Sequence, residues 1–472
     1  MREGAKKKVG YAFDSARPDA SERKLPTRVG FQGGFSKAIE LGIITPTHKQ
    51  MRIGLLECRV CHHTFMHTVL TPRREFWLLL TLAGIQFTHV LDFMIIMPLG
   101  PQLRDLFSIN DAQFGFLVSA YTFAAGASGL LAASFVDRFE RKRLLLVLYL
   151  LFGLTTLACA LAPSYGLLMA SRIAAGTFGG ILSAMTQTVI GDVIPFERRG
   201  RATGFVMTSF AMATVVGVPS GLFLANMGGW HSPFFAIAAV CAIVGVMAVI
   251  CLPRLDAHVA KAQGQQVSYA MQQVWADPNH RRALWMSAAM MFAGFTIIPY
   301  ITIYTQANHV LTLDEIPYIY LCGGTVTLLT ARWIGRLSDR VGKRKMFQRM
   351  LLLAIVPMTI TTLMQPAPLP LVLMVFAGFF FCMNARMIPG MAMLTSAAQP
   401  QWRGTFMSLN GAFQSVSIGL ASWLGGVLIQ RDANGHVTHF WLCALVGMAS
   451  TLLALWLSRR VEMHSAPSNS LA

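Results

Sequence analysis

The sequence predicts an all-α membrane protein whose twelve transmembrane helices form two six-helix bundles. Three observations predict this class. The 472 residues are 54% hydrophobic and only 13% charged, whereas soluble domains carry roughly 25% charged residues. The apolar residues fall into long stretches, and one basic motif occurs twice. Because backbone polar groups in lipid must be hydrogen-bonded within the chain, an apolar stretch of about 20 residues indicates a spanning helix.

Residues 1–73 are polar, basic and rich in Gly, Ser and Pro, without sustained periodicity. We expect them to form a disordered cytoplasmic extension. Cys58-x-x-Cys61-His62 matches the haem c attachment pattern, and the cysteines and histidines from Cys58 to His67 could instead ligate zinc. Haem attachment requires the outer side of the membrane, and initiation at Met51 or Met66 would make the segment an upstream extension. We therefore expect neither a metal nor a cofactor.

Twelve apolar stretches follow this segment. They lie near 76–98, 113–136, 144–162, 165–190, 202–225, 232–252, 283–307, 316–337, 346–364, 369–398, 405–430 and 439–458. The first six predict an N-terminal bundle over 74–252, and the last six predict a C-terminal bundle over 283–460. A polar cytoplasmic linker, 253–282, joins the bundles, and 461–472 form a cytoplasmic tail.

Lys and Arg lie where the positive-inside rule places them, in alternate connections between the stretches. One side receives Arg138, Arg141, Lys142, Arg143, Arg198, Arg199, Arg201, Arg340, Lys343, Arg344, Lys345 and Arg403, whereas the other receives only Arg104 and Arg431. We expect a multi-pass protein of the cytoplasmic (inner) membrane with both termini in the cytoplasm. The net charge of +18 could suggest binding to phosphates, but its position in short loops argues against a nucleic-acid partner.

The basic motif supplies an internal repeat. Residues 137–143 (DRFERKR) follow the second stretch, and 339–345 (DRVGKRK) follow the eighth. Arg199-Gly200 and Arg403-Gly404 repeat at nearly the same distance. Two six-helix halves of parallel topology explain this pattern, and such halves enclose a substrate cavity near the middle of the membrane.

At these residues the sequence resembles the major facilitator superfamily, over about 76–458, and within it the twelve-span drug and sugar efflux branch of drug:proton antiporters. The family loop signature, Gly-x-Leu-Ala-Asp-Arg-x-Gly-Arg-Lys, is best matched from Gly335 to Arg344, while Ser134 and Glu140 replace its glycines in the first copy. The resemblance implies a major facilitator fold and a gate on the cytoplasmic side. The gate residues it implies are Asp137, Arg138, Arg141, Lys142, Gly335, Asp339, Arg340, Gly342 and Lys343.

Two further motifs are similar to those of the family. The fourth stretch carries Arg172-x-x-x-Gly176, similar to an element linked to proton coupling. The fifth carries Ala213-x-x-x-Gly217-Val218-Pro219-Ser220-Gly221, similar to the antiporter motif Gly-x-x-x-Gly-Pro-x-x-Gly-Gly, with Ala for the first Gly and Pro one position late. We expect Gly176, Gly217, Pro219 and Gly221 to serve helix packing.

Ionisable residues inside the predicted spans are candidates for function, because a charge in hydrocarbon costs several kcal/mol. Asp92 in the first span and Arg172 in the fourth lie at matching depth. Burial favours a neutral acid and a guanidinium favours a carboxylate, so the pair could bind and release a proton. We expect Asp92 to carry the proton, and a static ion pair is the alternative. Gln86 and His89 share a broad helical face with Asp92, where His89 is either a second protonatable group or a packed neutral ring.

A second set of polar residues predicts the substrate cavity. Arg386 lies in the tenth span beside Asn384, and no acidic residue lies deep in the second half to neutralise it. A substrate anion or carbonyl could do so; alternatively Arg386 extends to the cytoplasmic side or bonds carbonyls freed near Pro389. The other candidates for the cavity are Gln187, Tyr300, Tyr304 and Gln414.

These features predict a secondary active transporter that couples proton movement to efflux of small organic solutes such as drugs, sugars or metabolites. An uptake symporter or a uniporter of the same fold is the nearest alternative, and a non-transporting membrane receptor or scaffold is an alternative of another class. No nucleophile–base pair, His-Glu-x-x-His or phosphate loop indicates an enzyme. We expect a monomer whose partners are a small-molecule substrate, protons and membrane lipid.

Overall fold

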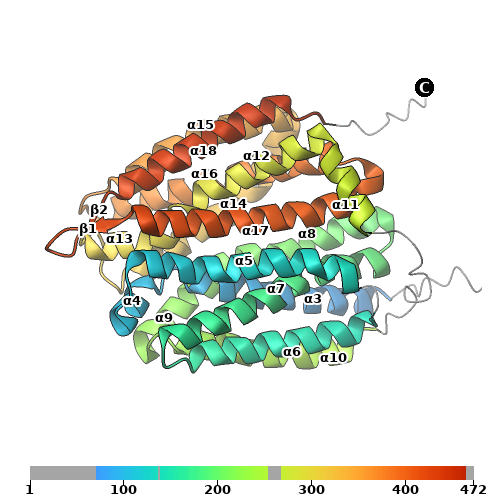
Figure 1. Cartoon of the computed structure of the whole chain (residues 1–472), viewed down its shortest axis with the longest axis horizontal. Coiled ribbons are helices and arrows are strands. Elements are labelled where there is room, and N and C mark those ends of the chain that lie inside the picture. The colour runs from blue at the N-terminus through green and yellow to red at the C-terminus, as the bar shows by residue number, and fades with distance from the viewer. Residues whose placement is uncertain (1–70, 137–138, 254–266, 464–472) are drawn as a thin grey trace, which may run out of the picture. The chain divides into compact units, whose positions relative to one another are not determined.

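The computed structural model describes residues 71–136, 139–253 and 267–463, and this part of the chain is almost entirely helical (Figure 1). The first half contains α3 (Pro72–Ile95), α4 (Gly100–Phe107), α5 (Asp111–Phe135), α6 (Arg141–Ala160), α7 (Tyr165–Val193), α8 (Phe196–Met212), the π-helix η2 (Ala213–Gly217), α9 (Val218–Gly228) and α10 (Ser232–Cys251). The second contains α11 (Val267–Ala276), α12 (Pro278–Phe295), the 3₁₀ helix η4 (Ile298–Tyr300), α13 (Ile301–Ala307), α14 (Ile316–Val341), α15 (Lys343–Thr362), α16 (Leu369–Ala397), the 3₁₀ helix η5 (Pro400–Trp402), α17 (Arg403–Leu428), β1 (Gln430–Arg431), β2 (Val437–Thr438) and α18 (Phe440–Arg460).

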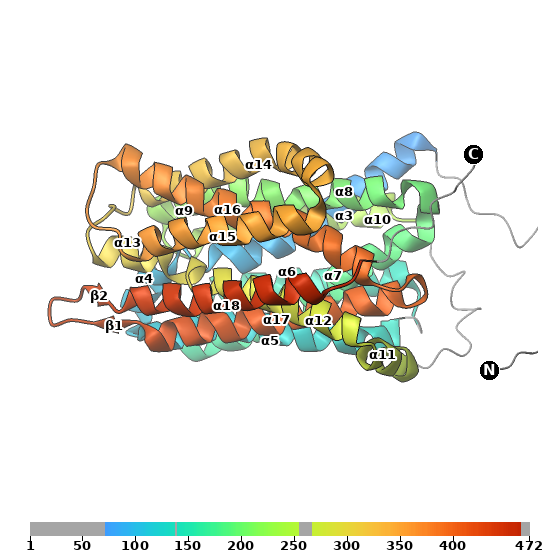
Figure 2. The same cartoon turned by 90° about the horizontal axis from the view of Figure 1, so that it is seen from above.

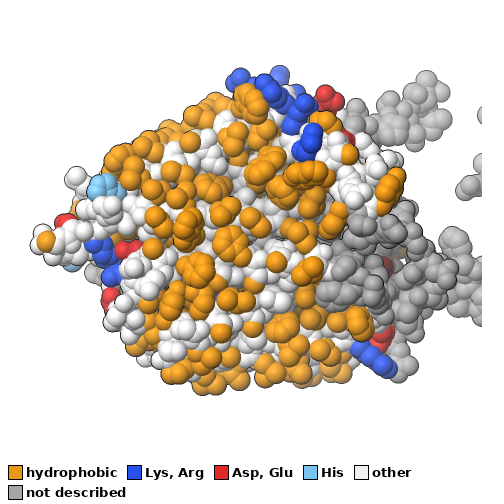
Figure 3. Space-filling view, in the orientation of Figure 1, with side chains coloured by type: hydrophobic (Ala, Val, Ile, Leu, Met, Phe, Trp, Pro, Cys, Tyr) orange, Lys and Arg blue, Asp and Glu red, His pale blue; other side chains and the backbone are white. Residues whose placement is uncertain are grey.

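The helices account for all twelve predicted spans. Ten segments are long and apolar enough to cross a membrane, counting α8–η2–α9 and α12–η4–α13 as one segment each. The eighth and ninth predicted spans are α14 and α15, which have 26 and 20 residues. Basic residues in the second half of α14 and in the first two turns of α15 lower the hydropathy of these helices. The twelve-span prediction is therefore confirmed. In Figure 3, apolar side chains are spread across the middle of the surface that faces the viewer, and charged side chains lie near its ends.

Local signals in the sequence explain where several spans begin. Asn110 and Gln113 form a reciprocal capping box at the start of α5, which satisfies two backbone N–H groups that a helix start leaves unpaired. The Ser164 hydroxyl accepts a hydrogen bond from the backbone N–H of Leu167 at the start of α7. Gly342 separates α14 from α15 with φ +95°, a left-handed conformation that favours glycine.

Two spans are interrupted at a proline. Pro219 follows the π-helix Ala213–Gly217 in the fifth span, and Pro299 lies in the 3₁₀ turn that divides α12 from α13. Proline has no N–H to donate to the preceding turn and its ring crowds that turn, so a wider or tighter turn relieves the clash locally. Pro357 and Pro389 instead lie inside continuous helices, α15 and α16.

The two halves meet along two pairs of helices. α5 packs along α17, and α14 packs against η2 and α9. In Figure 1 the helices of the second half lie above those of the first, with α17 directly on α5, and Figure 2 also shows α17 beside α5. The helices of each pair approach closely: a Cβ on Gly115 of α5 would lie 2.7 Å from the Ser422 carbonyl oxygen of α17, and the Ser119 hydroxyl donates to the Gly419 carbonyl at 2.7 Å.

The spanning region has two ends that differ in composition. The hairpin end carries the antiparallel hairpin of β1 and β2 together with the start of α5. The basic end carries the starts of α6, α15 and α17, where Arg141, Lys343 and Arg403 stand. We call these two faces the hairpin end and the basic end.

Candidate functional site

Two oppositely charged side chains meet inside the first half. Asp92 on α3 and Arg172 on α7 are both 0% exposed, and Arg172 Nη1 lies 2.9 Å from Asp92 Oδ2. The same nitrogen also donates to the Asp92 backbone carbonyl at 3.0 Å. The structure thus joins two residues that the sequence analysis placed at the same depth.

The helices around this pair support both partners. The Thr156 hydroxyl of α6 donates to Asp92 Oδ1 at 3.4 Å, and the Arg172 guanidinium lies over the Tyr121 ring of α5, 4.3 Å from its centroid. Gly176 allows α7 to lie this close to α5, because a Cβ there would lie 2.3 Å from the Tyr121 carbonyl oxygen. Four helices therefore hold one acid and one guanidinium away from water, where burial favours the neutral acid and the guanidinium favours the carboxylate.

His89 and Gln86 lie on α3, one and two turns before Asp92 in the chain. Neither ring nitrogen of His89 has a hydrogen-bond partner in the described part of the chain, and the ring packs near Tyr121 and Phe152, with centroids 6.1 and 6.2 Å away. Gly179 leaves the space for it, since a Cβ there would lie 2.4 Å from His89 Cδ2. Gln86 is 9% exposed. The imidazole is therefore held among aromatic rings, one turn from Asp92.

Aromatic rings connect the ion pair to the second half. Tyr121 stacks on Phe93 with centroids 5.5 Å apart, and Phe93 lies 6.0 Å from Phe295 at the end of α12. Phe93 and Phe295 are only partly buried, unlike Tyr121, which is 2% exposed. The sequence analysis missed these rings, because phenylalanine is too common in spanning helices to stand out.

Arg386 lies near the middle of α16, facing α12. It is 4% exposed, its Nη1 has no hydrogen-bond partner among the described residues, and a Cβ on Gly294 would lie 3.0 Å from its Nη2. Asn384 donates to the Thr327 hydroxyl of α14 at 3.2 Å, and Gln414 of α17 donates to the Ser287 hydroxyl of α12 at 2.7 Å. These three predicted cavity residues all lie in the second half.

The other predicted cavity residues lie elsewhere. Tyr300 is 0% exposed, and its hydroxyl donates to the Ser422 carbonyl. Tyr304 is 6% exposed and donates to the Met364 carbonyl at 2.8 Å, and Gln187 is exposed. The two tyrosine hydroxyls thus fasten backbone segments toward the hairpin end.

The motif residues of the fifth span face α3. A Cβ on Gly217 would lie 2.8 Å from Leu91 Cδ1, and one on Gly221 would lie 2.6 Å from Ile95 Cδ1. Pro219 is buried. The motif therefore packs against the turn of α3 that carries Asp92.

At the basic end, Arg141 forms an ion pair with Asp192 at the end of α7, with Nε and Oδ2 2.7 Å apart. Lys142 donates to the carbonyls of Val249 and Leu252 at 2.9 and 2.7 Å, where α10 ends. Asp192 was not predicted, although an acid near the end of a span is a signal that could have indicated it. In the second loop, Asp339 and Arg340 are exposed, Lys343 and Gly335 are partly exposed, and Gly342 makes the turn. Asp137 and Arg138 lie outside the described residues.

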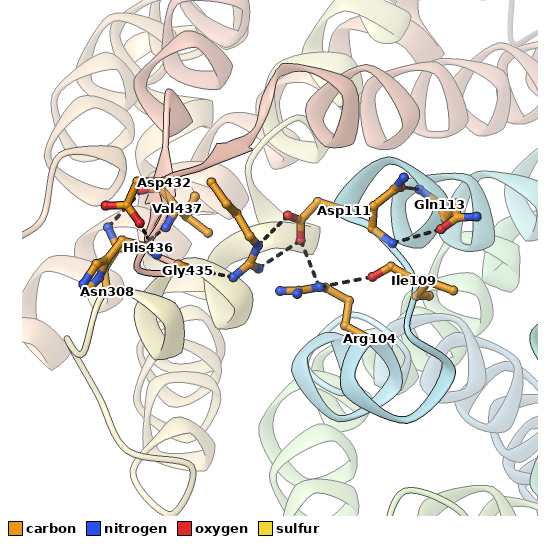
Figure 4. A network of polar contacts seen from close by, with 11 residues as sticks. Arg104, Ile109, Asp111, Gln113, Asn308, Asp432, Gly435, His436 and Val437 are labelled. Carbon is orange, nitrogen blue, oxygen red and sulfur yellow. Dashed lines mark hydrogen bonds and ion pairs between the residues drawn. The ribbon is translucent and has the colours of Figure 1, made fainter.

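At the hairpin end, Asp111 is the centre of a network between the halves (Figure 4). Arg431 Nε lies 2.8 Å from Asp111 Oδ2, and Arg104 Nε lies 3.6 Å from Asp111 Oδ1. Arg431 also donates to the Gly435 carbonyl of the hairpin turn at 2.8 Å. Arg104, Asp111 and Arg431 line a cavity of about 800 Å³ between α4, α5 and the end of α17. The positions of Arg104 and Arg431 in the sequence indicate only which connections they occupy, and this network could not be predicted from them.

Metal-ligating residues do not gather in the described ranges. There, no group of three or more His, Cys, Asp and Glu side chains is placed to hold a metal ion.

Comparison with known proteins gives a consistent result. The family model of the Major Facilitator Superfamily matches residues 82–422 and 333–471. YtbD of Bacillus subtilis (strain 168), an uncharacterized MFS-type transporter, is 25% identical over 389 residues, which span 81% of this chain and 96% of YtbD. Multidrug resistance protein 2 of the same organism is 21% identical over 373 residues, 78% of this chain and 92% of that protein. The crystal structure of a D-xylose-proton symporter, at 16% identity, superposes with a TM-score of 0.67 and covers 81% of this chain and 97% of the symporter.

Proposed function

Because the chain belongs to the Major Facilitator Superfamily, and is a multi-pass membrane transporter rather than an enzyme, we propose that it exports a small organic solute in exchange for protons by alternating access. Asp92 carries the proton in this proposal, and Arg172 sets when the proton binds. The observation that carries the proposal is the Asp92–Arg172 pair, in which both side chains are 0% exposed. A buried pair gains little stability over an apolar pair of similar volume, so its presence in a spanning region favours a functional role.

His89 and the aromatic rings extend this site. Deprotonation of Asp92 restores a full charge beside Arg172, and protonation leaves Arg172 without a counter-charge. The guanidinium over Tyr121 is placed to shift when its partner changes. Tyr121 contacts Phe93 of the first half, and Phe93 contacts Phe295 of the second half. In this proposal, a shift of the Arg172 guanidinium passes along these rings to the boundary between the halves.

We place the basic end in the cytoplasm, with both termini there and the protein in the cytoplasmic membrane, because the positive-inside rule favours that side. The bundles are then 74–252 and 283–460, joined by the cytoplasmic linker 253–282. The Asp111 network and the α5–α17 contact close the outer side. One matching crystal structure, a bacterial homologue of the lysosomal transporter Spinster with a TM-score of 0.65, is described as inward-facing, which supports this assignment of the closed end.

An uptake symporter is the second candidate, because the structure with a TM-score of 0.67 is a D-xylose-proton symporter. Multidrug resistance protein 2 of B. subtilis supports the efflux assignment instead. The two candidates differ in the sign of proton movement. An exporter takes up protons as the solute leaves, whereas a symporter moves both in the same direction.

Purified protein in proteoliposomes tests the proposal. A pH-sensitive dye inside the vesicles reports proton movement when drugs, sugars or amino acids are added one at a time, and the sign of the pH change separates exchange from symport. We expect proton movement that depends on a solute, is lost in Asp92→Asn, and persists in Asp105→Asn, a control that removes an exposed carboxylate. Solute-dependent proton movement that survives unchanged in Asp92→Asn would remove Asp92 from the coupling role.

A further inference from the structure

Three arginines are buried in the described part of the chain: Arg141, Arg172 and Arg386, which are 6%, 0% and 4% exposed. Arg141 pairs with Asp192 and Arg172 pairs with Asp92. Arg386 has no ion pair and no hydrogen bond to any described residue. The same kind of charge, buried to the same degree, therefore has a carboxylate partner at two positions and lacks one at the third.

The surroundings of Arg386 make this charge costly. A Cβ on Gly294 would lie 3.0 Å from Arg386 Nη2 and 3.4 Å from Met383 Sδ, so the guanidinium lies against a helix backbone and a thioether. The polar neighbour Asn384 is turned toward Thr327 and Phe380 instead. A guanidinium held among apolar groups needs a counter-charge, because its desolvation is otherwise uncompensated.

The groups that gather with the Arg386 guanidinium around Gly294 are apolar, namely Met383 and Ile298. Phe295 directly follows Gly294, and it faces Phe93 of the first half at 6.0 Å. Both rings are only partly buried, although each belongs to a spanning helix. A molecule bound at Arg386 would place its charged group on the guanidinium and its body against the apolar groups of α12 and α16 around Gly294, such as Met383 and Ile298.

We propose that Arg386 binds the charged group of the transported solute, and that this solute is a monoanionic organic acid with an apolar or aromatic body. A single guanidinium is neutralised by one negative charge, while a dianion such as phosphate would leave a net charge among apolar groups. While Asp92 is deprotonated it neutralises Arg172, so in that state Arg172 does not compete for the anion. The proposal rests on the transport function proposed above and adds the chemical class of the substrate.

The first experiment needs no substrate. The unfolding midpoint of the purified protein in detergent is measured for Arg386→Met, Arg386→Lys and Arg349→Met, the last of which removes an exposed arginine from α15. We expect Arg386→Met to raise the midpoint by a few degrees in the absence of solute, because it removes an uncompensated charge, and Arg349→Met to leave it unchanged. A lower midpoint in Arg386→Met would assign Arg386 a structural role and overturn the proposal.

The second experiment identifies the chemical class. The same midpoint is measured with benzoate, 2-naphthoate and hexanoate, with the amide of each, and with inorganic phosphate. We expect at least one carboxylate to raise the midpoint of the wild type while its amide and phosphate do not, and the shift to be lost in Arg386→Met and partly kept in Arg386→Lys. No shift with any carboxylate, an equal shift with an amide, or a shift that survives in Arg386→Met would each overturn the proposal.

Transport measurements separate this proposal from the proposed function. If a neutral solute drives proton movement in both wild type and Arg386→Met, the transport function stands and the preference for anions is wrong. If carboxylates bind through Arg386 but none moves protons, the anion site stands and the coupled transport is wrong.

Discussion

Arg431 and Asp111 form a two-bond ion pair between the halves, with Nε 2.8 Å from Oδ2 and Nη2 3.1 Å from Oδ1. They lie 320 residues apart in the chain. The paired geometry matches the fork of a guanidinium to a carboxylate, and Asp111 is 6% exposed. Since Arg431 belongs to β1 and Asp111 begins α5, separation of the halves at this end must break the pair.

We predict that Asp111→Asn favours opening at the hairpin end. Loss of a partly buried charged hydrogen bond costs about 1–2 kcal/mol, which is about 5- to 30-fold in population. Opening can be measured as the rate at which a membrane-impermeant maleimide labels Ser422→Cys in a cysteine-free background, because Ser422 is 0% exposed between the halves. Labelling should be faster by that factor in Asp111→Asn, and unchanged in Asp105→Asn. Equal rates in all three proteins would show that the ion pair does not hold this end closed.

We predict that Asp92 and Arg172 depend on each other for stability. Asp92→Leu leaves a buried guanidinium unpaired and should cost about 3–5 kcal/mol, whereas Asp92→Leu with Arg172→Met should recover most of that loss. Calorimetric unfolding of the four proteins of the cycle gives the coupling energy. The pair Glu75–Arg198, whose side chains are 15% and 49% exposed, is the control, and Glu75→Gln should cost no more than about 1 kcal/mol. Additive losses at Asp92 and Arg172 would contradict the prediction.

We predict that α7 tolerates alanine at one glycine and not at another. A Cβ at Gly176 would lie 2.3 Å from the Tyr121 carbonyl oxygen, whereas nothing lies within 4 Å of one at Gly191. Gly176→Ala should therefore destabilise the protein by about 1–3 kcal/mol or more through overpacking. Gly191→Ala should be neutral or stabilising by up to about 1 kcal/mol, since alanine is the better helix former. Unfolding midpoints and yields of folded protein check both, and similar values for the two variants would mean that α5 and α7 are less tightly packed.

We predict that Lys142 stabilises the end of α10 while Arg143 contributes little. Lys142 donates to two carbonyls that the end of α10 leaves without helical partners, so Lys142→Met should cost about 1 kcal/mol. The Arg143 side chain is 85% exposed and pairs with Glu140, and Arg143→Met should lie within about 0.5 kcal/mol of wild type. Both variants remove one positive charge from the first turn of α6. A comparison of their unfolding midpoints is therefore free of any effect of net charge, and a larger loss in Arg143→Met would sink the prediction.

The spans and one pair of residues could be predicted from the sequence. Twelve helices follow from hydropathy, because lipid leaves the backbone few alternatives. The pairing of Asp92 with Arg172 followed from their matching depth in the predicted spans, since few charged residues lie deep within the spans of the first half. Arg386 also stood out in this way, because no acid in the second half lies deep enough to neutralise it.

Other features depended on contacts that a sequence does not reveal. Arg431 and Asp111 lie near helix ends, where charges are common, and their meeting depends on the path of the hairpin. Among the prolines well inside predicted spans, Pro219 and Pro299 interrupt the helix whereas Pro357 and Pro389 do not, because neighbouring packing decides how each proline is accommodated. Tyr300 and Tyr304 were polar candidates for the cavity, yet which way a ring faces depends on the break between α12 and α13.

The wide turn at Ala213–Gly217 has a consequence for how the fifth span tolerates change. A π turn holds one residue more than an α turn. The side chains of the helix that follows it therefore point in the same directions as they would if the span had one residue fewer and no π turn. Leu222 and Ala225 beyond the turn remain on the buried side of α9. The additional residue of this span is thus absorbed within a single turn, and the late position of Pro219 leaves α9 packed against α3 and α14.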